Sequence, residues 1–230
     1  AIRQAPFGMV SICMFYVFTM TVLGALPLFG LVLAAFFMPF GTMLAIQDTK
    51  DTHEGRQPLY GILVELFKDR LKRFLLMRVG VIYAVFILIA NYAYVFLAVD
   101  DVSQWKIVDG RLDWTSVYAH FPWTAAIVTV IFYALGQMAT WFAPALVTWK
   151  NMTVGKAIFY SFFGCLRNWL AVIVLLVMIF GATLICALAV IILMDTLGIG
   201  DYSLFILTPI GFFITTWAYS TMWPMWVDIF

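Results

Sequence analysis

This chain of 230 residues contains six apolar segments that are each long enough to cross a bilayer. No other feature of the sequence restricts the possible folds as strongly. A transmembrane helix needs about 20 apolar residues to span roughly 30 Å of hydrocarbon. Only 11% of the residues are charged, whereas soluble domains carry about 25%. The chain is therefore predicted to be all-α, a polytopic membrane bundle that forms a single integral membrane domain over residues 1–230. The predicted spans are 7–26, 28–46, 74–97, 123–149, 169–194 and 204–223.

Lys and Arg lie mostly on one side of the predicted bundle. If both termini and the segments 47–73 and 150–168 share that side, it holds eleven of the thirteen basic residues. Only Lys106 and Arg111 then lie on the other side, in the segment 99–121. Because loops rich in Lys and Arg stay in the cytoplasm, the pattern predicts six spans with cytoplasmic N- and C-termini.

Two of the inner segments have the pattern of helices that lie on a membrane surface. In 58–73, apolar residues recur at helical spacing and charged residues take most other positions, which predicts an amphipathic helix. The segment 157–168 predicts a second, more apolar helix, which lies on the membrane or packs under the bundle. Basic side chains bind anionic headgroups. The candidate lipid or partner contacts are Lys68, Arg70, Lys72 and Arg73.

The outer segment 105–114 has the pattern of a β-hairpin. Asp109 and Gly110 suit the two positive φ angles of a type I′ turn. One register then joins opposite charges and two aromatic rings. Its pairs are Val108 with Arg111, Ile107 with Leu112, Lys106 with Asp113, and Trp105 with Trp114. The two tryptophans are therefore candidate contacts, either in a cap anchored on the bundle or in a docking site for a partner.

Prolines inside two of the spans mark an internal repeat. Phe37-Met38-Pro39 matches Phe142-Ala143-Pro144, and a polar turn, a short amphipathic helix and a basic residue follow each motif. Met222-Trp223-Pro224 is a third match. Proline removes a backbone hydrogen bond, and in lipid a neighbouring helix, water or a bound group must satisfy the freed carbonyl. Pro39 and Pro144 therefore mark either ordinary kinks or a solute site.

Two polar side chains, Asn91 and Gln137, are predicted to lie within the hydrocarbon. Their depths differ by roughly 10 Å at the rise of an α-helix, so they are not expected to pair with each other. We expect each to bond a neighbouring backbone group or hydroxyl. Gln137 is also the candidate solute-binding side chain, because it lies near the middle of its span.

The residue sets of the common catalytic and phosphate-binding motifs are missing from the sequence. The cysteines, Cys13, Cys165 and Cys186, and the histidines, His53 and His120, are too far apart in sequence to suggest a metal cage. No ionisable residue is predicted in the centre of a span, so proton- or ion-coupled turnover is not expected. We therefore expect no catalytic residue, no cofactor, no metal and no nucleic-acid partner.

Three stretches of the chain carry a likeness to known proteins. They are Trp141-Phe142-Ala143-Pro144-Ala145-Leu146-Val147, Gly155-Lys156-Ala157 with Cys165-Leu166-Arg167-Asn168-Trp169, and Leu26-Pro27-Leu28-Phe29-Gly30 with Pro39. On these residues the chain resembles a family of hypothetical, multi-pass inner-membrane proteins of proteobacteria, over most of its length. The resemblance implies a bacterial inner membrane and a non-catalytic protein, and it supplies no reaction, cofactor or substrate.

Two functions fit these patterns. The first is a membrane scaffold or accessory subunit, which binds lipids and either other membrane subunits or a second copy of itself. The second is a transporter or channel for a small solute or lipid, built on proline-kinked hairpins with Gln137 in a cavity. The absence of charge from the centre of the spans favours the first function.

The predicted orientation is testable by cysteine labelling in intact cells. An impermeant thiol reagent should label Asp109→Cys from the periplasm and should leave Glu54→Cys unlabelled, because the positive-inside rule puts position 54 in the cytoplasm. Labelling of Glu54→Cys from outside would overturn the orientation.

Overall fold

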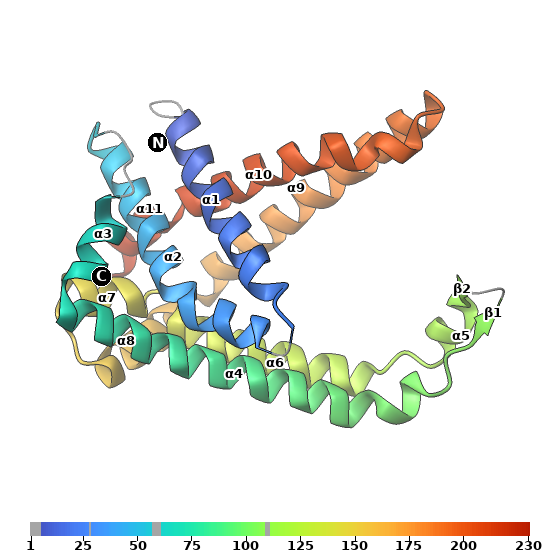
Figure 1. Cartoon of the computed structure of the whole chain (residues 1–230), viewed down its shortest axis with the longest axis horizontal. Coiled ribbons are helices and arrows are strands. Elements are labelled where there is room, and N and C mark those ends of the chain that lie inside the picture. Colours follow the sequence, from blue (N-terminus) through green and yellow to red (C-terminus); the bar gives the residue numbers. More distant parts are fainter. Residues whose placement is uncertain (1–5, 28, 57–60, 109–110) are drawn as a thin grey trace.

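The computed structural model describes residues 6–27, 29–56, 61–108 and 111–230, which are almost entirely helical (Figure 1). The first half contains α1 (Pro6–Gly24), α2 (Gly30–His53), α3 (Gly61–Lys68), α4 (Arg70–Val102), β1 (Ile107–Val108), β2 (Arg111–Leu112) and α5 (Trp114–Ala119). The second half contains α6 (Trp123–Thr140), α7 (Ala143–Trp149), α8 (Val154–Arg167), α9 (Trp169–Thr196), η1 (Gly200–Tyr202), α10 (Ser203–Ser220) and α11 (Met222–Ile229). The predicted all-α class is confirmed.

Five stretches of the described residues are long and apolar enough to cross a membrane. They are Gly30–His53, Arg70–Val102, Trp123–Trp149, Trp169–Thr196 and Ser203–Ile229, and they correspond to the last five predicted spans. The first predicted span falls on α1, whose apolar helix Gly8–Gly24 is shorter than this limit. The count of six spans therefore stays a prediction.

The second span continues beyond its predicted end. Residues 47–53 belong to α2, although the sequence pattern places them in a polar loop. This segment contains no glycine or proline, and the helix ends only before Gly55, whose φ of +76° an L side chain rarely adopts. The prediction relied on the polar composition of residues 47–53 and therefore ended the second span too early.

The prediction of a single amphipathic helix over 58–73 is wrong, because one helix ends before Asp69 and the next begins after it. The Asp69 carboxylate accepts hydrogen bonds from the backbone N–H groups of Leu71 and Lys72, at 2.9 and 3.1 Å, and so caps the start of α4. Of the predicted helix, α3 is a separate helix of eight residues, and residues 58–60 lie outside the described part of the chain. The segment 70–73 is the first turn of α4.

The second predicted surface helix corresponds to α8. Its buried residues, Ala157, Ser161 and Cys165, are spaced four apart and form one face. This face packs against α6 and α7. The helix therefore packs under the bundle along one side, and its bulky residues Phe159, Tyr160 and Phe163 remain exposed.

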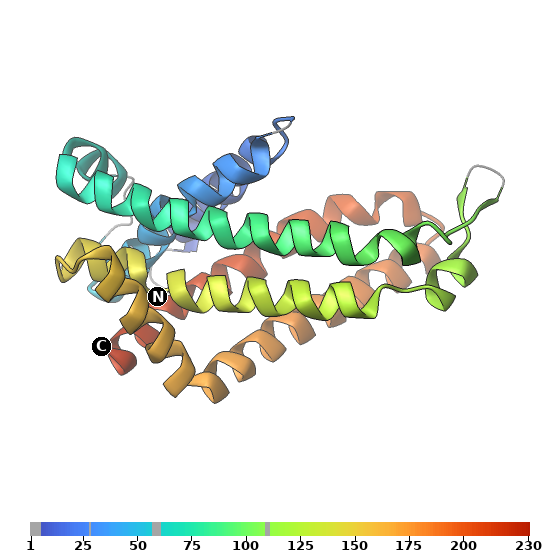
Figure 2. The ribbon, with the colours of Figure 1, turned by 90° about the horizontal axis from the view of Figure 1, so that it is seen from below.

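Close backbone contacts hold the centre of the bundle together. Helix α4 packs between α2 and α6, and its antiparallel pairing with α6 is clear in two views (Figures 1 and 2). At Gly80 of α4, a Cβ atom would lie 2.1 Å from the Phe36 carbonyl oxygen of α2. At Gly136 of α6, a Cβ atom would lie 2.8 Å from Cβ of Phe86 on α4. Small residues thus set both helix contacts.

The α9–α10 hairpin diverges from the α4–α6 pair (Figure 1). Helix α9 packs mainly on α10, with smaller contacts to α8 and η1. The largest buried cluster instead lies at the other end of the molecule, where residues of α2, α3, α4, α7, α8 and α11 meet around Phe142 and Leu146.

Replacing Gly80 with alanine should separate α2 from α4. The added methyl group would overlap the Phe36 carbonyl, and overpacking of this kind costs about 1–3 kcal/mol of folding free energy. The matched control is Gly181→Ala on α9, where no atom lies within 4 Å of the added Cβ. Thermal unfolding in detergent should show a lower Tm for the first variant only; equal Tm values would contradict the close contact.

Candidate functional site

The fourth span is interrupted beside Pro144, where the side chain of Ser161 enters the helical ladder. The Phe142 N–H donates to the Ser161 hydroxyl at 3.0 Å, and that hydroxyl donates to the Met138 carbonyl at 2.8 Å. Ser161 thus replaces the direct bond from residue 142 to residue 138 that an unbroken helix would make. Pro144 lies in the first turn of α7, a favourable position for proline.

The three proline motifs differ in structure. Pro39 lies inside α2, which continues through it as one helix. Near Pro144 the helix is interrupted between α6 and α7. Near Pro224 it is interrupted between α10 and α11, at Thr221. The predicted fourth span remains one apolar stretch, Trp123–Trp149, and its kink lies where Ser161 provides alternative partners for the backbone.

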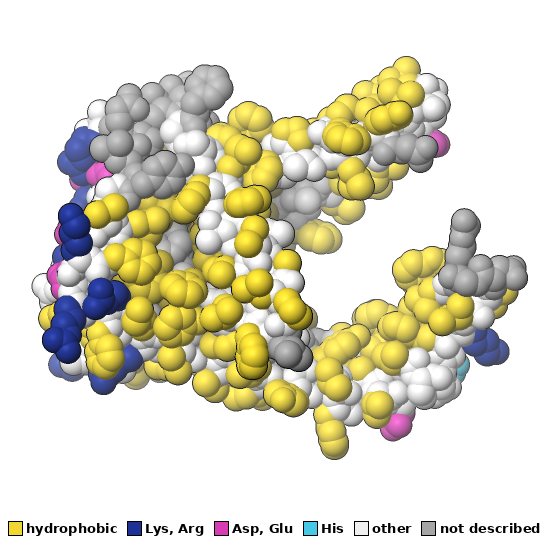
Figure 3. Space-filling model, in the orientation of Figure 1, with side chains coloured by type: hydrophobic (Ala, Val, Ile, Leu, Met, Phe, Trp, Pro, Cys, Tyr) yellow, Lys and Arg dark blue, Asp and Glu magenta, His cyan; other side chains and the backbone are white. Residues whose placement is uncertain are grey.

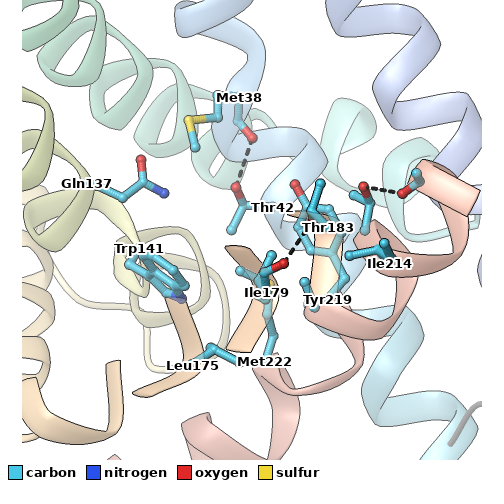
Figure 4. A pocket seen from close by; sticks show the side chains of 13 residues that line it. Met38, Thr42, Gln137, Trp141, Leu175, Ile179, Thr183, Ile214, Tyr219 and Met222 are labelled. Atoms are coloured by element: carbon cyan, nitrogen blue, oxygen red, sulfur yellow. Dashed lines mark hydrogen bonds between the residues drawn. The ribbon is translucent and has the colours of Figure 1, made fainter. Parts of the chain in front are cut away.

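A cavity of about 310 Å³ lies where α2, α6, α9 and α10 converge (Figure 4). It brings together Gln137, Met38, which precedes Pro39, and Trp141, which lies three residues before Pro144. Pro39 and Pro144 themselves do not line it. The threonine hydroxyls in its wall bond to their own helices, as Thr42 does to the Met38 carbonyl at 3.1 Å. The amide of Gln137 and the indole N–H of Trp141, which has no hydrogen-bond partner among the described residues, are therefore polar groups of the wall that could bind a solute.

Gln137 and Asn91 each join α6 to α4. The Tyr83 hydroxyl donates to Gln137 Oε1 at 3.2 Å. Asn91 Nδ2 donates to the Ile87 carbonyl at 2.8 Å and to the Tyr133 hydroxyl at 3.3 Å. The prediction that each bonds a neighbouring backbone group or hydroxyl is confirmed, and part of the polarity of Gln137 is used in helix packing.

The four predicted basic contacts separate into two pairs. Lys68 and Arg70 are exposed, at the end of α3 and the start of α4. Lys72 is half-buried and forms an ion pair with Glu65 at 3.4 Å, while Arg73 donates to the Phe67 carbonyl at the end of α3 at 2.7 Å. The last two therefore hold α3 against α4, which leaves Lys68 and Arg70 as the freely exposed members of the set.

A lysine between two tryptophans joins three helices, which the sequence pattern did not predict. Lys50 Nζ of α2 lies 4.9 Å from the ring centroid of Trp149 on α7 and 5.2 Å from that of Trp223 on α11. Trp149 Nε1 also donates to Gln47 Oε1 at 3.2 Å. Cation–π contacts of this kind stabilise a structure by about 0.5–2 kcal/mol. The basic end of α2 is thus part of the packed core.

The predicted hairpin forms, with its predicted register. Strands β1 and β2 pair Ile107 with Leu112 and Val108 with Arg111. The Asp113 N–H donates to the Lys106 carbonyl at 2.9 Å, which continues the ladder. The Asp109–Gly110 turn lies outside the described residues.

The predicted pairing of Trp105 with Trp114 is wrong. Trp114 begins α5, and its ring lies 6.4 Å from that of Tyr118. Trp105 Nε1 instead donates to the His120 carbonyl at 3.0 Å. The reason is the cap formed by Asp113, which accepts from the Thr115 hydroxyl and N–H and starts a helix where the strand was expected to continue. These bonds lower the pKa of Asp113, the hydroxyl bond most.

Asp48 is the polar residue that the sequence pattern most clearly misplaced. It was assigned to a solvated loop, but α2 extends through it and leaves it only 5% exposed. Its Oδ1 atom is buried without a hydrogen-bond partner among the described residues. The length of the segment without a helix breaker was the signal that could have revealed its helical placement.

Replacing Ser161 with alanine should destabilise the break between α6 and α7. The change leaves the buried Met138 carbonyl and Phe142 N–H without their shared partner, which costs about 1–3 kcal/mol. The matched control is Ser103→Ala, which removes an exposed hydroxyl that bonds only the Asp100 carbonyl. Chemical unfolding in detergent measures both; a silent Ser161→Ala variant would show that the bridge contributes nothing.

Comparison with known proteins extends the resemblance found in the sequence. No family model matches the chain, and no solved structure matches it. The chain is 26% identical to a probable inner membrane protein of Burkholderia thailandensis, over 99% of this chain and 86% of that protein. This similarity confirms the resemblance to uncharacterised inner-membrane proteins. Together with the apolar helices, it indicates a multi-pass protein of the bacterial inner membrane.

Proposed function

We propose that this chain is a non-enzymatic scaffold or accessory subunit, which packs its α9–α10 hairpin against the transmembrane helices of another protein subunit. The observation that carries the proposal is the exposure of α9. This helix of 28 residues buries only Met194, whereas α2 buries thirteen of its 24 residues. In a packed bundle each helix normally buries one face against its neighbours.

The space beside α9 is open on the side that faces the rest of the bundle. The space-filling view shows a hollow between the α9–α10 hairpin and the α4–α6 pair (Figure 3). The cavity around Gln137 lies at the base of this region, where α9 and α10 approach α2 and α6. A helix of a partner entering the hollow would contact α9 along a face that α10 leaves free.

Small residues on the hairpin support a helix partner. Gly80 and Gly136 are used inside the chain for close helix contacts, whereas a Cβ at Gly181 of α9 or Gly211 of α10 would meet no atom within 4 Å. Association in lipid depends on such close packing, because apolar surface alone provides no driving force there. Two unused glycines on the least packed helices therefore favour a contact between proteins over contact with lipid alone.

The proposed orientation places the basic end in the cytoplasm. Lys and Arg side chains gather at one end of the molecule, while hydrophobic side chains cover much of the rest of the visible surface (Figure 3). In this orientation both termini are cytoplasmic, α3 and α8 lie at the inner leaflet, and the hairpin and α5 face the periplasm. Lys68 and Arg70 then lie where anionic headgroups would contact them, each contributing about 1 kcal/mol.

A photo-crosslinking side chain on α9 tests the proposal. Placed at Ile185, which is 69% exposed, it should give a crosslink to one membrane protein in stoichiometric amount. The same group at Val95 of α4, which is 66% exposed on the opposite hairpin, is the matched position that should give no protein crosslink. Gly181→Leu should reduce the Ile185 crosslink by about tenfold, since overpacking a close helix contact costs about 1–3 kcal/mol and 1.4 kcal/mol is about tenfold in binding.

Gly24→Leu is the control for the glycine variant, because a Cβ atom there also meets no atom within 4 Å. It should leave the crosslink unchanged. Crosslinks from Ile185 to lipid alone would contradict the proposal. So would solute flux by the pure protein in liposomes that disappears on Gln137→Leu, which would instead favour the transporter function.

A further inference from the structure

The carboxyl group of Asp48 lies in an environment that disfavours its ionised form. Its neighbours on α2 include the buried residues Leu44, Ala45 and Thr49, and its Oδ1 atom is fully buried without a hydrogen-bond partner among the described residues. An isolated carboxylate in an apolar interior is strongly unfavourable unless a positive charge or several donors compensate it. In membrane proteins, such residues mark proton or ion sites.

A small cavity adjoins this carboxyl group. It encloses about 10 Å³, close to the space that one water molecule requires. Residues of α1, α2 and α10 meet around it, among them Cys13, Tyr16, Thr216 and Tyr219. The Tyr16 ring lies close against Gly41, where any Cβ would overlap it, and meets the Tyr219 ring edge to face at 5.6 Å.

No basic side chain lines this cavity among the described residues. The titratable groups nearby are Cys13 and Tyr16 from α1, Tyr219 from α10, and Asp51 one turn along α2. Asp51 forms an ion pair with Arg56 at 2.6 Å, so that guanidinium is already engaged elsewhere. Among the described residues no cation is left to compensate Asp48, which favours its neutralisation by a proton or by a small cation from solution.

The lining favours a proton over a metal cation. Apart from the carboxyl group, it provides three hydroxyls, those of Tyr16, Thr216 and Tyr219. Thr216 already donates its proton to the Phe212 carbonyl at 2.7 Å. A metal cation would need several oxygen ligands in place of its hydration shell, whereas the Tyr16 and Tyr219 hydroxyls already bond each other. A neutral carboxyl group needs only one acceptor, which a single water or hydroxyl provides.

We propose that Asp48 and the adjoining one-water cavity form a proton-binding site that controls the packing of α1 on α2 and α10. Binding transfers a proton from hydronium to the carboxylate, which leaves a neutral carboxyl group and a water molecule. The neutral form is compatible with Met9, Ile12 and Cys13, which are 2%, 2% and 5% exposed on α1. Release of the proton places a charge against these residues, so α1 separates and water enters.

Infrared spectroscopy of the full chain in lipid nanodiscs tests for the proton. At neutral pH the wild-type protein should show a carboxylic-acid C=O band that shifts on ¹³C-aspartate labelling and on exchange into D₂O. The band should be lost in Asp48→Asn and retained in the matched variant Asp51→Asn. A missing band, or one that persists in Asp48→Asn, would overturn the proposal. If Asp48→Asn fails to fold, the labelled wild-type band and its presence in Asp51→Asn decide the test.

A second arm distinguishes a proton from sodium. Replacing sodium chloride with choline chloride should leave the band unchanged; a band that appears only without sodium would assign the site to the metal cation and overturn the proposal. The link to α1 is measured by modification of Cys13 with a thiol reagent as the pH rises. The rate should rise several-fold more in the wild type than in Asp48→Asn, and identical pH profiles would contradict the coupling.

Discussion

The helical hydrogen-bond ladder is interrupted at Phe142, and the hydroxyl of Ser161 makes this kink possible inside the membrane. Lipid cannot satisfy a freed backbone group, but Ser161 bonds the N–H of Phe142 and the carbonyl of Met138 at once. The break sends α7 into the interior, where every residue from Ala143 to Thr148 is buried. Helices α2, α4 and α8 pack around α7, and the rings of Trp226 and Phe230 lie 6.2 and 5.5 Å from that of Phe142. The largest buried cluster of the described residues is therefore built next to this side-chain bridge.

Helix contacts in this protein are of two kinds. Between α2, α4 and α6, glycines bring backbones close together, and tyrosine–amide hydrogen bonds add specificity at Gln137 and Asn91. In the α9–α10 hairpin, α9 buries only Met194 among the described residues, and α10 packs on α1 and α2 around Thr216 and Tyr219. Because dispersion and close packing drive association in lipid, the first group is a fixed unit, whereas the second has surface available for another helix. This difference connects the fold to the proposed role as a membrane subunit.

The internal repeat is visible in the order of helices. A span, a short helix and a second span occur in this order as α2, α3 and α4, and again as α6 with α7, α8 and α9. The copies differ where the prolines lie. Helix α2 continues through Pro39, whereas the chain breaks before Pro144, where α8 contributes Ser161. A proline is compatible with both outcomes, so the neighbouring helix decides between them.

The sequence by itself determined the all-α membrane class, five spans of sufficient length, the register of the hairpin and the local bonding of Asn91 and Gln137. These features follow from hydrophobic length, from turn chemistry and from the need of polar groups for near partners. Only the tertiary structure decided the break at Trp141, the burial of Asp48 and the use of Lys72 and Arg73 inside the protein. The physical reason is that each depends on a partner supplied from another element: Ser161 on α8, the wall of α1 and α10, and Glu65 or the Phe67 carbonyl on α3. Spacing along one helix carries no information about such partners.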